Sequence, residues 1–250
     1  MSVLELDSRL ELPVGAGIRI VAVLDDDRGQ AKAVGFQLED EGLEALVVDL
    51  DEIPNVDDAV AWVSTHAHAV ICDLQLSPMH DGISYDGAQL VARLVSEHRI
   101  PCVLTTGFAP DVGMLVRPHR HTIPVLLTRD QTEQSDVLIE GLTRCAAEIR
   151  EGRDAGRRTY RVPLFVERAG MTQYGVALDA RVGGWAHKTP MRFPAWMLGD
   201  EYTSPAEAEA LVGKVFFAHV NLGAKQEPDL FFEAPEVEFV EPDGQELHFG

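Results

Sequence analysis

Short apolar runs alternate with segments of helical periodicity over the first 150 residues of the chain. Five runs rich in β-branched and other apolar residues are predicted strands: 18–24, 43–50, 69–76, 101–105 and 124–128. In the segments between and after them, apolar residues recur every three or four positions, as in amphipathic helices. These predicted helices cover 28–41, 57–66, a stretch beginning near Asp86, 111–117 and 132–151, of which 111–117 is short and poorly patterned. Five strands alternating with five helices predict an α/β domain with a doubly wound parallel sheet.

The pattern changes after residue 155, where segments that alternate or run apolar are separated by Gly and Pro. The predicted strands here are 160–166, 174–180, 214–221 and 229–239, with one helix at 205–212. This predicts a small β-rich barrel or sandwich. The expected organisation is a lead-in (1–17), an α/β domain (18–131), a terminal helix and linker (132–154) and a β-rich domain (155–250).

Composition and charge narrow the class of protein. The chain has 250 residues, of which 46% are hydrophobic, and a formal net charge of −20, which opposes binding to a nucleic-acid backbone. The predicted helix after residue 155 carries Glu207 and Glu209 and no basic residue, so DNA is not an expected partner. No run approaches the length of a membrane span, and the acidic start is unlike a signal peptide. We expect a cytoplasmic protein without membrane contact, whose three cysteines are reduced.

Polar side chains with related chemistry follow the predicted parallel strands. Asp25 and Asp26 come after the first strand, and Asp73 ends the apolar part of the third. Thr105 ends the fourth strand and Arg129 follows the fifth. Because the carboxyl ends of parallel strands meet at one edge of a sheet, these groups should lie together. Three carboxylates form an oxygen-only set suited to Mg²⁺ or Mn²⁺, and a hydroxyl and a cation beside them suit a phosphoryl group.

Residues 18–150 resemble the receiver domain of two-component response regulators. The matching motifs are Asp25-Asp26 after Ile-Val-Ala-Val-Leu, Asp73 in Ile-Cys-Asp-Leu, Asp86-Gly87, Thr105 in Val-Leu-Thr-Thr, and Leu-Leu-Thr-Arg at 126–129. The resemblance implies a flavodoxin-like fold in which Asp25 and Asp26 hold Mg²⁺ together with Asp73. Asp73 would accept a phosphoryl group from a histidine kinase, and Thr105 would respond by moving inward. Repacking of the fourth helix, fifth strand and fifth helix would then act on the β-rich domain.

The chain departs from the receiver pattern in three places. Arg129-Asp130 stands where the family has lysine and proline, and a planar guanidinium does not reproduce the point charge of an ammonium group. Leu126 replaces an aromatic switch residue, and the loop after Asp73 is about six residues longer than usual, with His80 and Tyr85 in it. These departures favour an alternative, a pseudo-receiver that is not phosphorylated and serves as a protein-interaction adaptor.

Two further expectations concern activity and partners. The run Val-Val-Asp-Leu-Asp-Glu-Ile at 47–53 resembles the nucleophile motif of haloacid-dehalogenase-like phosphatases, with Asp49 and Asp51 as the two acids. That motif usually opens the first strand, whereas here it ends the second, so this is the second alternative. The chain is expected not to be an enzyme beyond self-phosphorylation and self-dephosphorylation at Asp73. Its expected partner is a histidine kinase or another signalling protein, and a second copy of the chain is a further candidate.

Overall fold

The computed structural model describes residues 17–76, 82–107 and 112–240. The predicted lead-in lies outside this part of the chain except for Gly17, and His80 also lies outside it. The described chain forms two compact units. Of the described residues, the first unit comprises 17–107, with the gap noted above, and 122–153, and the second comprises 112–121 and 154–240.

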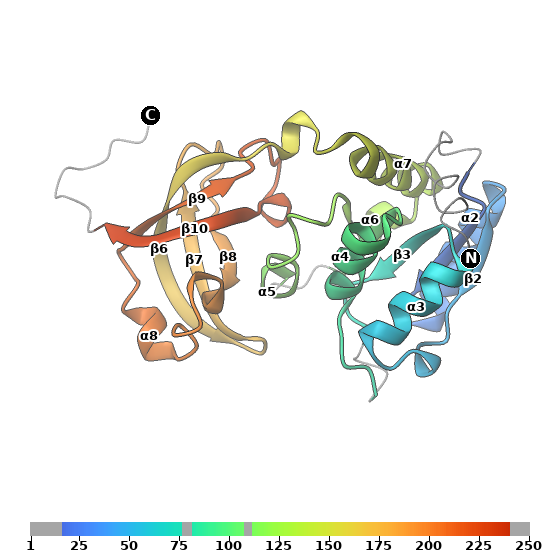
Figure 1. Ribbon diagram of the computed structural model, residues 1–250, viewed down its shortest axis with the longest axis horizontal. Coiled ribbons are helices and arrows are strands. Elements are labelled where there is room, and N and C mark those ends of the chain that lie inside the picture. The colour runs from blue at the N-terminus through green and yellow to red at the C-terminus, as the bar shows by residue number, and fades with distance from the viewer. Residues whose placement is uncertain (1–16, 77–81, 108–111, 241–250) are drawn as a thin grey trace. The chain divides into compact units, whose positions relative to one another are not determined.

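The first unit is built on a five-stranded parallel sheet (Figure 1). Its strands are β1 (Ile20–Leu24), β2 (Glu44–Val47), β3 (Ala69–Asp73), β4 (Cys102–Thr106) and β5 (Leu126–Thr128). They lie in the order β2-β1-β3-β4-β5, and each neighbouring pair is parallel. This is the flavodoxin-like order of a doubly wound sheet, in which sites form outside the carboxyl ends of the strands. The predicted α/β class and receiver-like fold are therefore confirmed.

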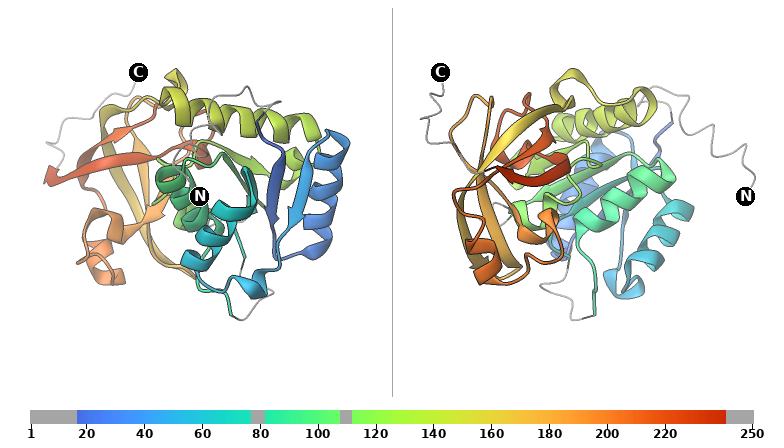
Figure 2. Two further views of the ribbon diagram at one scale, coloured as in Figure 1. Left: turned by 45° about the vertical axis from the view of Figure 1, so that its right-hand side comes forward. Right: turned by 60° about the vertical axis from the view of Figure 1, so that its left-hand side comes forward.

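Helices cover both faces of this sheet (Figure 2). They are α2 (Arg28–Asp40), α3 (Val56–His66), α4 (Gly87–His98), α6 (Arg129–Thr132) and α7 (Ser135–Glu151), with the short 3₁₀ helix η1 (Leu50–Glu52) after β2. Apolar side chains of α2 and α7 pack on one face in a shared core with β1, β3, β4 and the start of β5. Helices α3 and α4 pack against each other on the opposite face. Every residue of β3 is buried, as a central strand of such a sheet requires.

The second unit contains a five-stranded antiparallel sheet. Its strands are β6 (Tyr160–Thr172), β7 (Gly175–Val182), β8 (Met191–Pro194), β9 (Val215–Val220) and β10 (Phe232–Val240), in the order β10-β9-β6-β7-β8. The short helices of this unit are α5 (Val112–Val116), η2 (Ala155–Arg157), η3 (Ala195–Leu198), α8 (Pro205–Glu209) and η4 (Glu227–Asp229). The β-rich prediction is confirmed, and the sheet is open, with β10 and β8 at its edges.

Two features of this sheet differ from the sequence pattern. Strand β8 was not predicted, because it has four residues and ends on a proline, which is tolerated at a sheet edge. Strand β6 runs six residues further than predicted. The pairing of β6 with β7 shifts register between Val166 and Arg168, so the alternation of apolar and polar side chains breaks there while the backbone pairing continues.

Aromatic rings fill the core of the second unit. Phe193 meets Phe232 edge to face with ring centroids 5.0 Å apart, and Phe216 lies 6.2 Å from both rings. Trp185 is buried and its indole N–H donates to the carbonyl of Ala224 at 2.8 Å. Trp196, by contrast, has half of its surface exposed.

Residues 110–121 are placed differently from the expectation. The pattern predicts a helix over 111–117 within the first domain. The described part forms α5, a helix of five residues that packs with β8 and η4 of the second unit. Gly113 allows this packing, since a Cβ there would lie 2.6 Å from the carbonyl oxygen of Arg192. The chain therefore leaves the first unit between β4 and β5 and returns to it.

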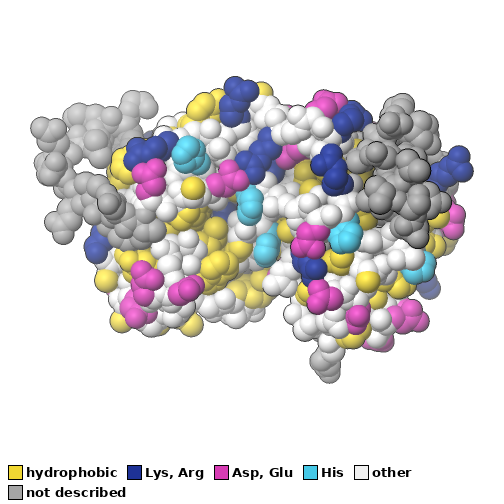
Figure 3. All heavy atoms as spheres, viewed as in Figure 1, with side chains coloured by type: hydrophobic (Ala, Val, Ile, Leu, Met, Phe, Trp, Pro, Cys, Tyr) yellow, Lys and Arg dark blue, Asp and Glu magenta, His cyan; other side chains and the backbone are white. Residues whose placement is uncertain are grey.

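The surface charge is mixed. On the face drawn in Figure 3, acidic and basic side chains are interspersed in both units. Among the helices that the structure describes, none has the length and apolar character needed to cross a bilayer.

Candidate functional site

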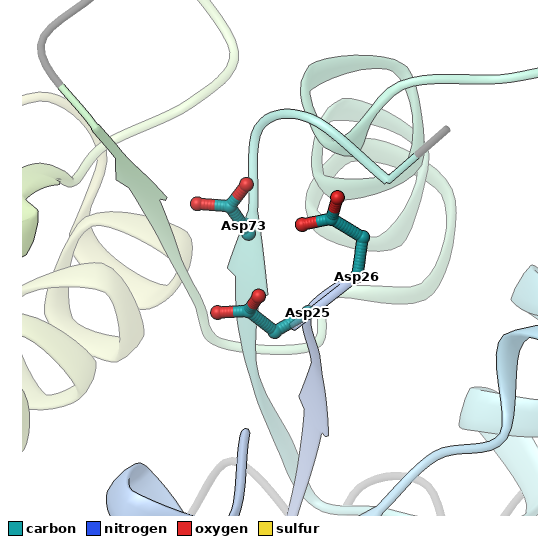
Figure 4. Close-up of side chains that lie close together, drawn as sticks. All are labelled: Asp25, Asp26 and Asp73. Carbon is teal, nitrogen blue, oxygen red and sulfur yellow. The ribbon is translucent and has the colours of Figure 1, made fainter. Parts of the chain in front are cut away.

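Three carboxylates gather at the carboxyl ends of β1 and β3 (Figure 4). Asp25 and Asp26 directly follow β1, and Asp73 is the last residue of β3. One oxygen from each carboxylate lies within 4.8 Å of the others. Because β1 and β3 are parallel neighbours, the two apolar runs end side by side, and the predicted proximity of these acids follows from the pairing.

Backbone amides hold two of the three carboxylates in place. Asp25 Oδ1 accepts a hydrogen bond from the Asp27 amide at 2.9 Å, and Asp73 Oδ2 accepts one from the Gln75 amide at 2.9 Å. Asp27 has a different role, because its carboxylate caps α2 by accepting from the Gly29 amide at 2.8 Å. The acidic triplet therefore divides into one helix cap and two members of the site.

The predicted hydroxyl and cation both lie near Asp73. Thr105 is paired with Asp73 in the register of β3 and β4, and its Oγ1 lies 3.5 Å from Asp73 Oδ1 and 3.3 Å from the Cys72 carbonyl. An Arg129 guanidinium nitrogen lies 3.7 Å from Asp73 Oδ1 and 4.0 Å from Asp25 Oδ2. Asp73 Oδ2 is thus held by the backbone, while Oδ1 faces the hydroxyl and the cation.

A close approach of α4 fixes the end of β3. A Cβ on Gly87 would overlap the carbonyl oxygen of Asp73, so only glycine fits at this point. The Gly87 amide donates to the Leu74 carbonyl at 2.9 Å. Asp86 caps α4 by accepting from the Gln89 amide at 2.9 Å, and burial raises the pKa of this carboxyl. The Asp86-Gly87 motif therefore positions the backbone of Asp73 rather than supplying a ligand to it.

The described part of the long loop after Asp73 is anchored to the chain after η1. The Tyr85 hydroxyl is buried and donates to the carbonyl of Ile53 at 3.1 Å, and the Ser84 amide donates to that of Pro54 at 3.1 Å. Burial raises the pKa of Tyr85, which keeps this donor protonated. Leu126, at the position of the family's aromatic residue, is buried in β5.

The electrostatics of the acidic cluster fit a divalent cation. Burial, followed by the nearby charge of Asp73, raises the pKa of Asp25 to about 6 against the opposing hydrogen bond from Asp27. Burial also raises the pKa of Asp73, which is 5% exposed. Buried like charges destabilise one another unless a cation joins them, and an all-oxygen set suits Mg²⁺. Asp25, Asp26 and Asp73 are the residues that would hold it.

The acids of the alternative phosphatase motif are engaged otherwise. Asp49 caps η1, accepting from the Asp51 amide at 3.2 Å, and its second oxygen pairs with Arg28 at 2.7 Å. The first interaction is a helix cap, and the second is an ion pair between exposed side chains. They occupy the two oxygens of the carboxylate that would have to act as nucleophile in that mechanism.

Fold and site together define a receiver-like unit with an acidic cluster at its strand ends. No family model and no curated protein matches the chain. Similar solved structures include the signal receiver domain of a modulated diguanylate cyclase from Desulfovibrio desulfuricans G20, with 19% identity over 54% of this chain and 99% of that chain and a TM-score of 0.43. A response regulator receiver domain protein from Clostridium thermocellum has 13% identity over 53% of this chain and 98% of that chain, with a TM-score of 0.41. A response regulator from Burkholderia pseudomallei has 17% identity over 53% of this chain and 71% of that chain, with a TM-score of 0.38.

Proposed function

We propose that this protein is a response-regulator-like signalling protein in which Asp73 accepts a phosphoryl group and the second unit delivers the response. The observation that carries the proposal is that Asp73 Oδ1 lies close to both the Thr105 hydroxyl and the Arg129 guanidinium, while Asp25 and Asp26 gather with Asp73 at the same strand ends. The donor would be a phosphorylated histidine of a kinase or another signalling protein. We propose that the protein does not turn over a separate substrate.

The chemistry follows from the two oxygens of Asp73. Oδ1, which is not held by the Gln75 amide, would attack phosphorus, forming the O–P bond of an acyl phosphate as the P–N bond of the donor breaks. The electron pair of that bond stays on the imidazole, which takes up a proton from water. Mg²⁺ bound by the three acids would neutralise phosphoryl oxygens. Hydrolysis by water would return the carboxylate and release inorganic phosphate.

Thr105 and Arg129 would stabilise the phosphorylated state. The Thr105 hydroxyl lies within 3.5 Å of Oδ1 and could donate to a phosphoryl oxygen after a small movement. Arg129 offers a guanidinium with several donors, which suits phosphate oxygens even though its geometry differs from that of a lysine. The side chain is 43% exposed, so it is free to follow the larger group.

Beryllofluoride, which mimics the acyl phosphate, tests the proposal directly. With Mg²⁺ and beryllofluoride, we expect higher thermal stability and slower amide exchange around β3 and β4. Both effects should disappear in Asp73→Asn and persist in Asp49→Asn. No response at saturating Mg²⁺ would instead support the pseudo-receiver alternative. Hydrolysis of a generic phosphomonoester that is lost in Asp49→Asn and kept in Asp73→Asn would establish the phosphatase.

A further inference from the structure

Residues 112–121 connect two strands that carry site residues but fold with the second unit. Thr105 is on β4, before the segment, and Arg129 directly follows β5, after it. The segment itself belongs to the second unit together with the described residues 154–240. The stretch of chain between Thr105 and Arg129, two residues that lie near Asp73 Oδ1, therefore includes a piece of the second unit.

Two arginines anchor the segment. Arg117 is 1% exposed, and its guanidinium donates to the Arg192 carbonyl at 3.1 Å, to the Glu227 and Leu230 carbonyls and to the carboxylate of Glu227. Arg120 is 2% exposed and pairs with Asp229 at 2.9 Å. Separating a buried guanidinium group from its partners costs free energy, because the carbonyl and carboxylate acceptors are left without a donor and the charges without a counter-charge. The segment is thus fastened to β8, to η4 and to Leu230, which follows η4.

Helix η2 of the second unit contacts the end of the segment. Arg157, in η2, donates to the carbonyls of Arg120 and His121 at 3.1 and 3.0 Å. Its guanidinium also lies 4.8 Å from the centre of the Phe231 ring. Three arginines from the segment and from η2 therefore converge on residues 227–231.

Strand β5 depends on how its ends are held. It has three residues and lies at the edge of the sheet, where β4 is its neighbour. Its ladder with β4 has three residue pairs, so its order also depends on how its two ends are held. The segment precedes β5 along the chain, and Arg129 follows it immediately. We therefore expect the anchoring of the segment to affect the position of Arg129.

We propose that residues 112–121 are a tether through which the second unit controls the order of β5 and the position of Arg129 at the Asp73 site. This inference goes beyond the proposed function but rests on it for its consequence, namely regulation of phosphorylation by whatever the second unit binds. A partner that loosens or tightens residues 227–231 would change the resistance of β5 to opening. Conversely, occupation of the Asp73 site would change the stability of residues 227–231 against local opening, because coupling between two sites is reciprocal.

The test uses the full chain and mild substitutions. Asp229→Asn removes the charge paired with Arg120 and keeps the shape of the side chain, and Glu227→Gln does the same for Arg117. The matched control is Glu236→Gln, which weakens the exposed pair of Arg161 and Glu236 in the same unit. Hydrogen exchange is followed, without any phosphodonor, in β5, in β1 and in residues 227–231.

We expect exchange in β5 to rise on the order of threefold or more in Asp229→Asn or Glu227→Gln, with β1 unchanged and the control like wild type. Faster exchange at 227–231 with no change in β5 would overturn the inference. Addition of Mg²⁺ and beryllofluoride then tests the proposed function separately. If the Asp73 site does not respond, phosphorylation is refuted while the exchange result still decides the tether. If the site responds, slower exchange at 227–231 in wild type supports the tether, and a response confined to the first unit contradicts it.

Discussion

The guanidinium of Arg129 lies 3.7 Å from the carboxylate of Asp73, and the same nitrogen lies 4.0 Å from Asp25. One positive charge is therefore shared by the carboxylates of Asp25 and Asp73. Both distances exceed that of a close hydrogen bond, so the charge stabilises the pair while leaving room for a larger group on Asp73. Arg129 thus places one positive charge beside both Asp25 and Asp73.

Replacement of Arg129 should weaken binding of a phosphoryl mimic. In Arg129→Gln, we expect the affinity for beryllofluoride in the presence of Mg²⁺ to fall about tenfold, equivalent to about 1.4 kcal/mol, because one charge-assisted contact is lost. Arg129→Lys should retain part of this affinity, since it keeps the charge. Titration followed by amide exchange measures both, with Arg150→Gln, an exposed arginine on α7, as the control. An unchanged affinity in Arg129→Gln would show that Arg129 does not contact the ligand.

Removal of Mg²⁺ should expose the repulsion within the acidic cluster. The folded-state pKa of Asp25, about 6, lies above its ordinary value, so its charged form costs folding free energy at pH 7.5. In metal-free protein, Asp25→Asn should therefore stabilise the fold by about 2 kcal/mol. Chelator-treated and Mg²⁺-loaded samples are compared by denaturant unfolding. Mg²⁺ should stabilise wild type and Asp49→Asn, and its effect should be much reduced in Asp25→Asn. Equal stabilisation of wild type and Asp25→Asn by Mg²⁺ would place the metal elsewhere.

Local pattern was sufficient for the sheet and for the acids at its edge. Apolar runs that stop on Asp25 and Asp73 identify strand ends, and parallel pairing brings strand ends together regardless of the rest of the fold. The placement of residues 112–121 was not predictable in this way. Arg117 and Arg120 look like surface residues in the sequence, and they are buried because their acceptors come from residues more than 70 positions away. Periodicity carries no information on such partners.

The region between Gly152 and Arg158 illustrates the same limit. Its glycines and arginines indicate a linker, and Gly152 does end α7 with a positive φ of 88°. Arg157, however, is 7% exposed and bonds to the carbonyls of two residues in the tether. A composition typical of linkers thus contains an anchor of the second unit, because one arginine finds carbonyl acceptors and an aromatic face.

Substitution of Gly87 should damage the Asp73 site without touching a carboxylate. A methyl group at Gly87 would meet the Asp73 carbonyl, so α4 or the end of β3 must move. We expect Gly87→Ala to cost about 1–3 kcal/mol of folding free energy, as overpacked sites do, and to weaken Mg²⁺ binding. Gly82→Ala is the control, since a Cβ there meets nothing within 4 Å. Calorimetry of unfolding and Mg²⁺ titration measure the two effects; wild-type behaviour of Gly87→Ala would mean that the contact relaxes freely.

Acid should loosen the second unit through His119, which lies in the tether. Burial lowers the pKa of this imidazole below its ordinary value of 6.5. The folded state therefore favours the neutral ring, and the unfolded chain binds a proton first as pH falls. Stability contributed by neutral His119 is complete above about pH 6.5 and is lost as pH falls from there toward the folded-state pKa. Denaturant unfolding of wild type between pH 8 and 5 should show this loss, and His119→Gln should flatten the curve over the same window. His187→Gln, an exposed histidine of the same unit, is the control, and a pH dependence identical in wild type and His119→Gln would assign the effect to other groups.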